Sequence, residues 1–100
     1  MKSGYRIEWT EHALTDLSEL YDYLEENWTE REMINLSNEI EKIIRLISKN
    51  PELFQGSKYK KGVRRVVILK YNSLYYRIVQ ETVEILSFFS NRKNPGSLKI

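Results

Sequence analysis

The sequence contains no cysteine and a single histidine, His12. Without cysteine there is no disulfide framework, no thiolate nucleophile and no cysteine-based metal site, and one histidine excludes a histidine-rich metal site. We therefore expect neither a metal nor another cofactor. No apolar run approaches the roughly 18 residues that a membrane-spanning helix needs, and the N-terminus lacks the apolar stretch of a signal peptide. These absences predict a cytoplasmic protein with no membrane contact.

Length and composition predict one globular domain that spans residues 1–100. A chain of 100 residues is close to the commonest domain size and too short for two independent cores. Hydrophobic residues make up 41% and charged residues 30% of the sequence, which is ordinary for a folded protein. Disorder is therefore not expected.

Charge is distributed unevenly along the chain, although the formal net charge is only +2. Residues 1–50 contain 6 Lys and Arg against 11 Asp and Glu, which gives −5, and residues 51–100 contain 10 against 3, which gives +7. Such asymmetry indicates a basic face that binds a polyanion or an acidic protein segment.

The first half of the chain predicts a short strand followed by an amphipathic helix. Tyr5–Trp9 alternates apolar and charged residues with period two, which is typical of a half-buried strand. Thr10 stands where a helix N-cap belongs. Beyond it, apolar residues recur every three or four positions and line one helical face. They are Ala13, Leu14, Leu17, Leu20, Tyr21, Leu24 and Trp28.

A second helix is predicted from Thr29 onward. Thr29 and Glu32 have the spacing of a capping box, and Asn50–Pro51 ends the helix because proline cannot continue it. The apolar stripe consists of Met33, Leu36, Ile40, Ile43, Ile44 and Ile47. Two helices with so short a connection are expected to pack as an antiparallel hairpin.

The second half reads as three β-strands in an antiparallel meander. β-branched and aromatic residues dominate Val63–Lys70, Leu74–Val79 and Val83–Ser90, and the turns are predicted at Tyr71–Ser73 and Gln80–Thr82. Both faces of Val63–Lys70 are mostly apolar, which predicts an interior strand that is covered on each side.

These elements predict an α+β fold: an N-terminal strand, an antiparallel α-helical hairpin and a three-stranded antiparallel β-meander. The combined stripe of the helices needs an apolar cover, and one face of the meander is the sizeable apolar surface that remains. Neither the register of the strands nor the place of Tyr5–Trp9 in the sheet follows from the sequence.

Cations and tyrosines in and after the predicted strands are the candidate functional residues. An arginine just past a strand end is held by the strand and can grip a phosphate or carboxylate with two parallel bonds, so Arg92 is the strongest candidate. The candidates for binding a polyanion or an acidic protein partner are Arg64, Arg65, Lys70, Arg77, Arg92 and Asn94, and those for base stacking are Tyr71 and Tyr75.

Each candidate also has a purely structural interpretation. The arginines of the strands then only solvate a sheet edge, Arg92 pairs with a helix acid, and the tyrosines pack across strands. His12 lies far in sequence from the basic strands, which favours a surface or staple residue over a catalytic one. The pattern assigns no catalytic residue.

Several segments, taken together and in order, carry a family resemblance. They are Ile7–Thr10 with Ala13, Asp16–Leu17, Tyr23–Leu24, Ile47–Pro51, Val63–Arg65, Leu74–Ile78 and Val83–Pro95. Over nearly the whole chain they resemble the RelE/ParE superfamily, the toxins of type II toxin–antitoxin modules, also described as plasmid stabilisation proteins. The resemblance implies the fold derived above and a cognate antitoxin whose C-terminal segment wraps the toxin. It also implies binding to operator DNA only as the complex.

The resemblance leaves the target open between DNA gyrase, which ParE-like members inhibit, and ribosome-bound mRNA, which RelE-like mRNA interferases cleave. An enzyme of this kind would be a metal-independent endoribonuclease. Many relatives have His where this chain has Ser90, and the ribosome-dependent nucleases have Arg in the region of Asn72–Ser73. These departures weaken the nuclease interpretation. They also motivate a second hypothesis, a catalytically inactive toxin-like module that serves as antitoxin partner and transcriptional corepressor.

Overall fold

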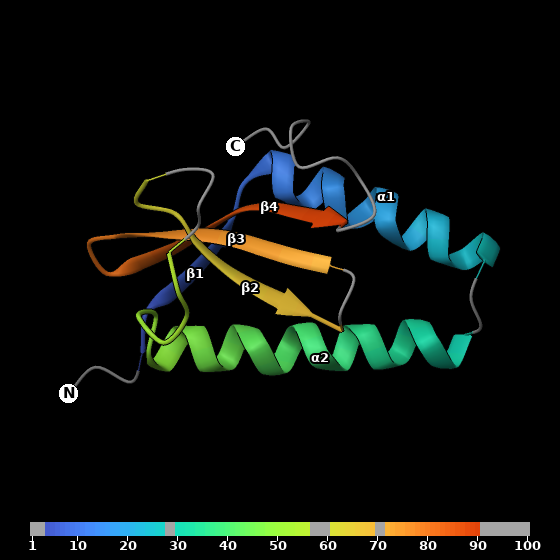
Figure 1. The fold of residues 1–100 in the computed structure, drawn as a ribbon, viewed down its shortest axis with the longest axis horizontal. Coiled ribbons are helices and arrows are strands. Elements are labelled where there is room, and N and C mark those ends of the chain that lie inside the picture. Colours follow the sequence, from blue (N-terminus) through green and yellow to red (C-terminus); the bar gives the residue numbers. More distant parts are fainter. Residues whose placement is uncertain (1–3, 28–29, 57–60, 70–71, 91–100) are drawn as a thin grey trace.

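A computed structural model describes residues 4–27, 30–56, 61–69 and 72–90 (Figure 1). The elements are β1 (Arg6–Trp9), α1 (Glu11–Asn27), α2 (Glu30–Lys49), β2 (Arg64–Ile68), β3 (Asn72–Val79) and β4 (Thr82–Ser90). This order confirms the predicted α+β fold with a strand, two helices and a three-stranded meander. No helix in these ranges is long and apolar enough to cross a membrane.

The four strands form one sheet in the order β1-β4-β3-β2. β2 with β3 and β3 with β4 pair antiparallel, which confirms the meander. β1 pairs parallel with the first half of β4, from Arg6 opposite Thr82 to Trp9 opposite Ile85. The sheet is therefore mixed, and the strand that the sequence could not place lies at its edge.

Two predictions about the strands are wrong. β2 is the other edge of the sheet rather than an interior strand, and Val67 is 45% exposed on it. Asn72 and Ser73 belong to β3 rather than to a turn, and they are only 3% and 0% exposed. Both residues pair with β2 on one side and with β4 on the other, so pairing on two sides overrides their local preference for turns.

α1 begins at the predicted cap. The Ala13 amide donates to Thr10 Oγ1 over 3.1 Å. Ala13 and Leu24 are buried on the sheet side, and Leu17, Leu20 and Tyr21 are partly buried against the core. Leu14 is 52% exposed and so does not belong to the buried stripe. Trp28, predicted as the last residue of that stripe, lies outside the described residues.

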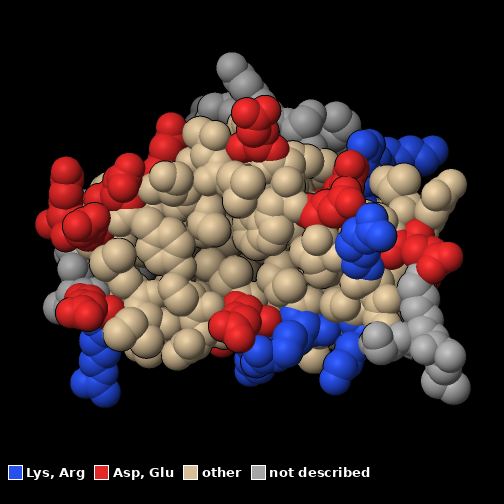
Figure 2. Space-filling model, turned by 180° about the vertical axis from the view of Figure 1, so that it is seen from behind, with Lys and Arg blue, Asp and Glu red and all other residues tan. Residues whose placement is uncertain are grey.

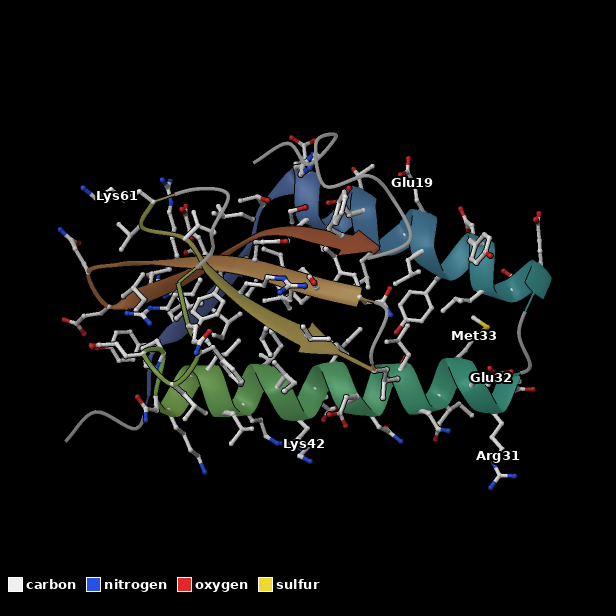
Figure 3. The ribbon with its side chains drawn as sticks, viewed as in Figure 1. Glu19, Arg31, Glu32, Met33, Lys42 and Lys61 are labelled. Atoms are coloured by element: carbon white, nitrogen blue, oxygen red, sulfur yellow. The ribbon has the colours of Figure 1, made fainter. Side chains whose placement is uncertain are left out.

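α2 is the more strongly amphipathic helix. Its buried residues are Leu36, Ile40, Ile43 and Ile47, as predicted from their spacing. Met33 points from α2 toward α1, whereas Arg31 and Lys42 point away from the sheet (Figure 3). The predicted cap residue Thr29 lies outside the described residues.

The helices cover one face of the sheet and run in opposite directions, separating from the end at which they are joined (Figure 1). α1 packs along β4, and α2 packs on β1 and β2. The strand residues of the core are Val66, Ile68, Leu74, Tyr76, Val83, Ile85 and Phe88. Alternate residues of each strand therefore face the helices, and the residues between them form the opposite surface, here named the open face.

A β-bulge interrupts β4 at Leu86. Tyr76 lies opposite Ile85 and Tyr75 lies opposite Ser87, so Leu86 has no partner residue on β3. The extra residue changes the spacing, and Ile85 and Phe88 both reach the helix side although they are three positions apart. The bulge lies next to the point at which β1 ends.

Candidate functional site

Arg64 and Arg65 are neighbours in sequence but occupy opposite faces of β2. Arg64 is on the helix side, where its Nη1 donates to the Phe54 carbonyl over 2.7 Å. Tyr76, its partner on β3, donates from its hydroxyl to the Pro51 carbonyl over 2.6 Å. These bonds attach residues 51–54 to the sheet, so Arg64 has a structural role.

Burial of the Tyr76 side chain has an electrostatic consequence. Desolvation raises the pKa of Tyr76 above its ordinary value of 10.0, and the positive charge of Arg64 offsets this rise in part. A tyrosine that is neutral at pH 7 and donates to a carbonyl does not serve as a proton acceptor.

Arg65 is the arginine of the open face that is held by a hydroxyl rather than by an acid. Its Nε donates to Ser73 Oγ over 3.0 Å, and its backbone amide donates to the Gln55 carbonyl over 3.0 Å. The side chain is half-buried. A guanidinium has five N–H donors, and the Nε bond holds this one, so the head is fixed while its outer edge can bind an anion.

Arg77 is paired with an acid on the neighbouring strand. Its Nε lies 2.6 Å from Glu84 Oε1, and the two residues are register partners on β3 and β4. On β1, Arg6 lies 3.6 Å from Glu8. The described part of the open face thus carries acids beside its cations and is less basic than the charge of the second half predicts. For Arg77 the salt bridge is the structural interpretation.

The remaining predicted residues are either buried or outside the described part of the chain. Tyr75 is on the open face but only 2% exposed, so its ring cannot stack on a base in this structure. Its neighbours Ser73 and Ser87 are also buried. Lys70, Tyr71, Arg92 and Asn94 lie outside the described residues.

Sequence analysis assigned no role to Asp16, an acidic residue of the first helix. Asp16 Oδ2 accepts from Ser87 Oγ over 2.8 Å and from the Phe88 amide over 3.1 Å. His12 Nε2 lies 3.3 Å from the same oxygen, with a half-exposed side chain. The signal was available, because Asp16 follows Ala13 by three positions and precedes Leu20 by four and so shares their buried face.

The helix side of the molecule presents a broad uncharged surface, here named the helix-side surface. Figure 2 shows it surrounded by charged residues, most of them acidic at the end where α1 and α2 meet. The partly buried apolar residues that β1, α1 and α2 add to the core are Ile7, Trp9, Leu17, Leu20, Tyr21, Met33 and Ile44. The Tyr21 hydroxyl and Ser37 Oγ form a hydrogen bond between the two helices.

A shallow cavity of about 500 Å³ lies between the start of β1, the end of α2 and the β3–β4 turn. Its lining residues are Gly4, Tyr5, Arg6, Ser48, Gln80, Glu81 and Thr82. Among the residues that the structure describes, no group of three or more His, Cys, Asp or Glu could hold a metal ion.

Comparison with protein families identifies the kind of protein. Residues 7–95 match the model of the ParE toxin of the type II toxin–antitoxin system parDE. The chain belongs to the ParE toxin family. This confirms the superfamily resemblance and makes the protein a ParE-type toxin of a toxin–antitoxin system.

Solved structures agree with the ParE fold. The chain is similar to a chromosomal ParDE toxin–antitoxin structure from P. aeruginosa, with 18% identity and a TM-score of 0.73 over 89% of this chain and 98% of that one. It is also similar to a copper-bound mutant toxin from Helicobacter pylori, with 19% identity and a TM-score of 0.58 over 88% and 96% of the two chains. No curated protein matches the sequence.

Proposed function

We propose that this ParE-type toxin arrests growth by binding a large target and that a cognate antitoxin neutralises it. DNA gyrase is the first candidate for the target, and ribosome-bound mRNA is the second. The observation that carries the proposal is the family match over residues 7–95. Binding is favoured over RNA cleavage because the groups beside the arginines in the described residues are already engaged: Glu84 pairs with Arg77, and the Tyr76 hydroxyl donates to the Pro51 carbonyl. Cleavage through the ribose 2′-hydroxyl needs a base and an acid beside the cations.

The open face supports the proposal with one anchored cation. Arg65 is held by the neutral Ser73 hydroxyl. In contrast, Arg64 donates to the Phe54 carbonyl on the helix side, and the charge of Arg77 is paired with that of Glu84. A fixed guanidinium binds carboxylate or phosphate with less loss of side-chain entropy than a mobile one. We therefore assign target contact to Arg65 together with Arg92 and Asn94, which follow β4 in the sequence.

The helix-side surface supports the antitoxin as partner. An uncharged surface surrounded by charges (Figure 2) fits an amphipathic segment whose apolar side covers the middle and whose polar side meets the surrounding charges. The toxin–antitoxin context of the family supplies such a partner. In this arrangement the antitoxin covers the side of the molecule that the target does not use, or reaches around it to the open face.

Expression of the toxin alone, with and without a co-expressed antitoxin, tests the function. We expect growth arrest with intact cellular mRNA, inhibition of supercoiling by purified gyrase, and relief of both by the antitoxin. Growth arrest accompanied by cleaved mRNA would identify ribosome-bound mRNA as the target instead of gyrase. A well-folded protein that arrests nothing would support the corepressor hypothesis, in which the toxin binds operator DNA only together with the antitoxin.

Arg92→Lys tests the residue that the sequence favours most. If Arg92 holds a phosphate or carboxylate with its planar fork, lysine keeps the charge but loses the paired bonds, and we expect most of the activity to disappear. Growth arrest and thermal melting of Arg92→Lys and Arg92→Ala are measured side by side. If both variants are folded and fully toxic, Arg92 does not belong to the contact surface.

A further inference from the structure

β4 is longer than the strand that protects its outer edge. β1 pairs with Thr82–Ile85, and β4 continues to Ser90. The outward N–H and C=O groups of the second half of β4 therefore need other partners, because unpaired edge groups are costly when buried and adhesive when exposed.

Thr10, just before α1, and Asp16 on α1 supply partners for three of these groups. The Thr10 amide donates to the Ile85 carbonyl over 3.0 Å, and Thr10 Oγ1 donates to the Leu86 carbonyl over 3.3 Å. Asp16 continues the series, because its Oδ2 accepts from the Phe88 amide. The first two turns of α1 thus replace a neighbouring strand at this edge.

The bonds to Asp16 converge on one carboxylate oxygen. Besides the Phe88 amide, Ser87 Oγ donates to it, and His12 Nε2 is 3.3 Å away. The Ser87 residue is 1% exposed, and the Asp16 side chain is 20% exposed. Hydrogen bonds to a carboxylate are stronger than bonds between neutral groups, so this oxygen is a firm attachment between α1 and β4.

The bulge lies immediately before this attachment. Leu86 has no partner on β3, so pairing with β3 is interrupted immediately before Ser87 and Phe88. Bulges bend a strand and redirect the residues that follow. Without a second attachment the end of β4 would be held on its β3 side alone.

We infer that Asp16 is a positioning residue that fixes the second half of β4, the strand that Arg92 and Asn94 follow in the sequence. The functional part of this inference rests on the proposed function, in which those two residues contact the target. Asp16 itself touches no target group. It acts through the Phe88 amide and the Ser87 hydroxyl.

Hydrogen exchange at the Phe88 amide tests the attachment directly. In Asp16→Ala the amide loses its acceptor, and we expect its exchange to become about tenfold faster, as for the loss of one hydrogen bond, while amides of β3 keep their rates. Asp16→Asn retains an acceptor oxygen and should show a smaller effect. Ser87→Ala should leave the amide protected, and Asp22→Asn, an exposed acid on the same helix, is the matched control.

Growth arrest supplies the functional readout. We expect Asp16→Ala to lose arrest while still binding the antitoxin, and Asp22→Asn to behave as wild type. An unchanged exchange rate of the Phe88 amide in Asp16→Ala overturns the inference. Faster exchange throughout the sheet also overturns it, because Asp16 would then stabilise the whole fold rather than the end of β4. If Asp16→Ala remains fully toxic although its Phe88 amide exchanges faster, the functional part of the inference is overturned. If wild-type protein arrests nothing, the proposed function and this functional part fail together, and the exchange rates alone decide whether Asp16 fixes β4.

Discussion

The two faces of the sheet differ in what holds them together. On the helix side, apolar residues of all six elements form one core, and the polar contacts there attach residues 51–54 to the sheet. On the open face, cations lie beside acids and hydroxyls, as in Arg77 with Glu84 and Arg65 with Ser73. The first face accounts for most of the stability, and the second leaves charged groups for binding. Substitutions on each face should therefore change different measurements.

Ile43→Ala should give the largest loss of stability. Ile43 is 7% exposed in the middle of α2, and truncating a buried isoleucine costs about 2–5 kcal/mol because it leaves a cavity. Ile34→Ala on the same helix is the matched control, since Ile34 is 53% exposed and should change the free energy of unfolding by no more than about 0.5 kcal/mol. Urea titration of both variants measures the difference. Equal losses would mean that the stripe of α2 does not define the core.

Tyr76→Phe should cost about 1–3 kcal/mol, because the buried Pro51 carbonyl loses the hydroxyl that donates to it. The variant should also change the pH dependence. Since burial raises the pKa of Tyr76 above 10.0, the unfolded chain loses this proton first as pH rises, and stability falls above about pH 10. Thermal melting between pH 8 and 11 should show a shallower alkaline decline for Tyr76→Phe than for wild type. An identical decline in both proteins would assign it to other groups.

Charge reversal separates the two arginines of the open face. Arg65→Glu removes a guanidinium that is held by a neutral hydroxyl and should weaken target binding about tenfold or more through lost bonds and repulsion, with little change in melting temperature. Arg77→Glu places a second acid beside Glu84, so we expect a loss of stability of up to about 1 kcal/mol and a smaller effect on binding. Calorimetry with the target or antitoxin, together with melting curves, checks both. Reversed roles would place the contact surface around Arg77.

The sequence predicted local structure better than long-range pairing. Thr10 as a cap and the stripe of α2 follow from helical spacing, which involves residues close in sequence. The parallel pairing of β1 with β4 joins residues about 76 positions apart, and nothing in Tyr5–Trp9 specifies that partner. For the same reason β2 was wrongly predicted to be an interior strand. An apolar residue on a strand does not reveal whether a neighbour covers it, and Val67 is exposed.

The candidate site was predicted only in part for a related reason. The arginines were identified by their charge, but their partners depend on the register, which pairs Arg77 with Glu84 and sets Arg65 beside Ser73. Tyr75 was assigned to stacking from its residue type, although burial removes it from the surface. Asp16 was missed because a charged residue on a helix is normally exposed, and its partners, Ser87 and Phe88, lie more than 70 positions away.

A substitution in the β3–β4 turn should have the smallest and most local effect on stability. Gln80 and Glu81 connect Val79 to Thr82, and Gln80 has φ 54°. A residue with a Cβ is strained in this left-handed region by about 1 kcal/mol or more, whereas glycine adopts it freely. Two-residue hairpin turns accordingly favour glycine where φ is positive.

Gln80→Gly should therefore stabilise the protein by a few tenths of a kcal/mol and by at most about 1 kcal/mol, because relief of the strain exceeds the greater entropy of glycine in the unfolded chain. Gln80→Ala keeps the Cβ and should bring no gain, which separates backbone strain from loss of the glutamine side chain. Urea titrations with an unchanged slope against denaturant measure both variants. The turn lies on neither face of the sheet, so growth arrest should stay at the wild-type level. If the glycine variant is less stable than the alanine variant, the positive φ does not strain Gln80. The hairpin is then held by its strand pairs alone.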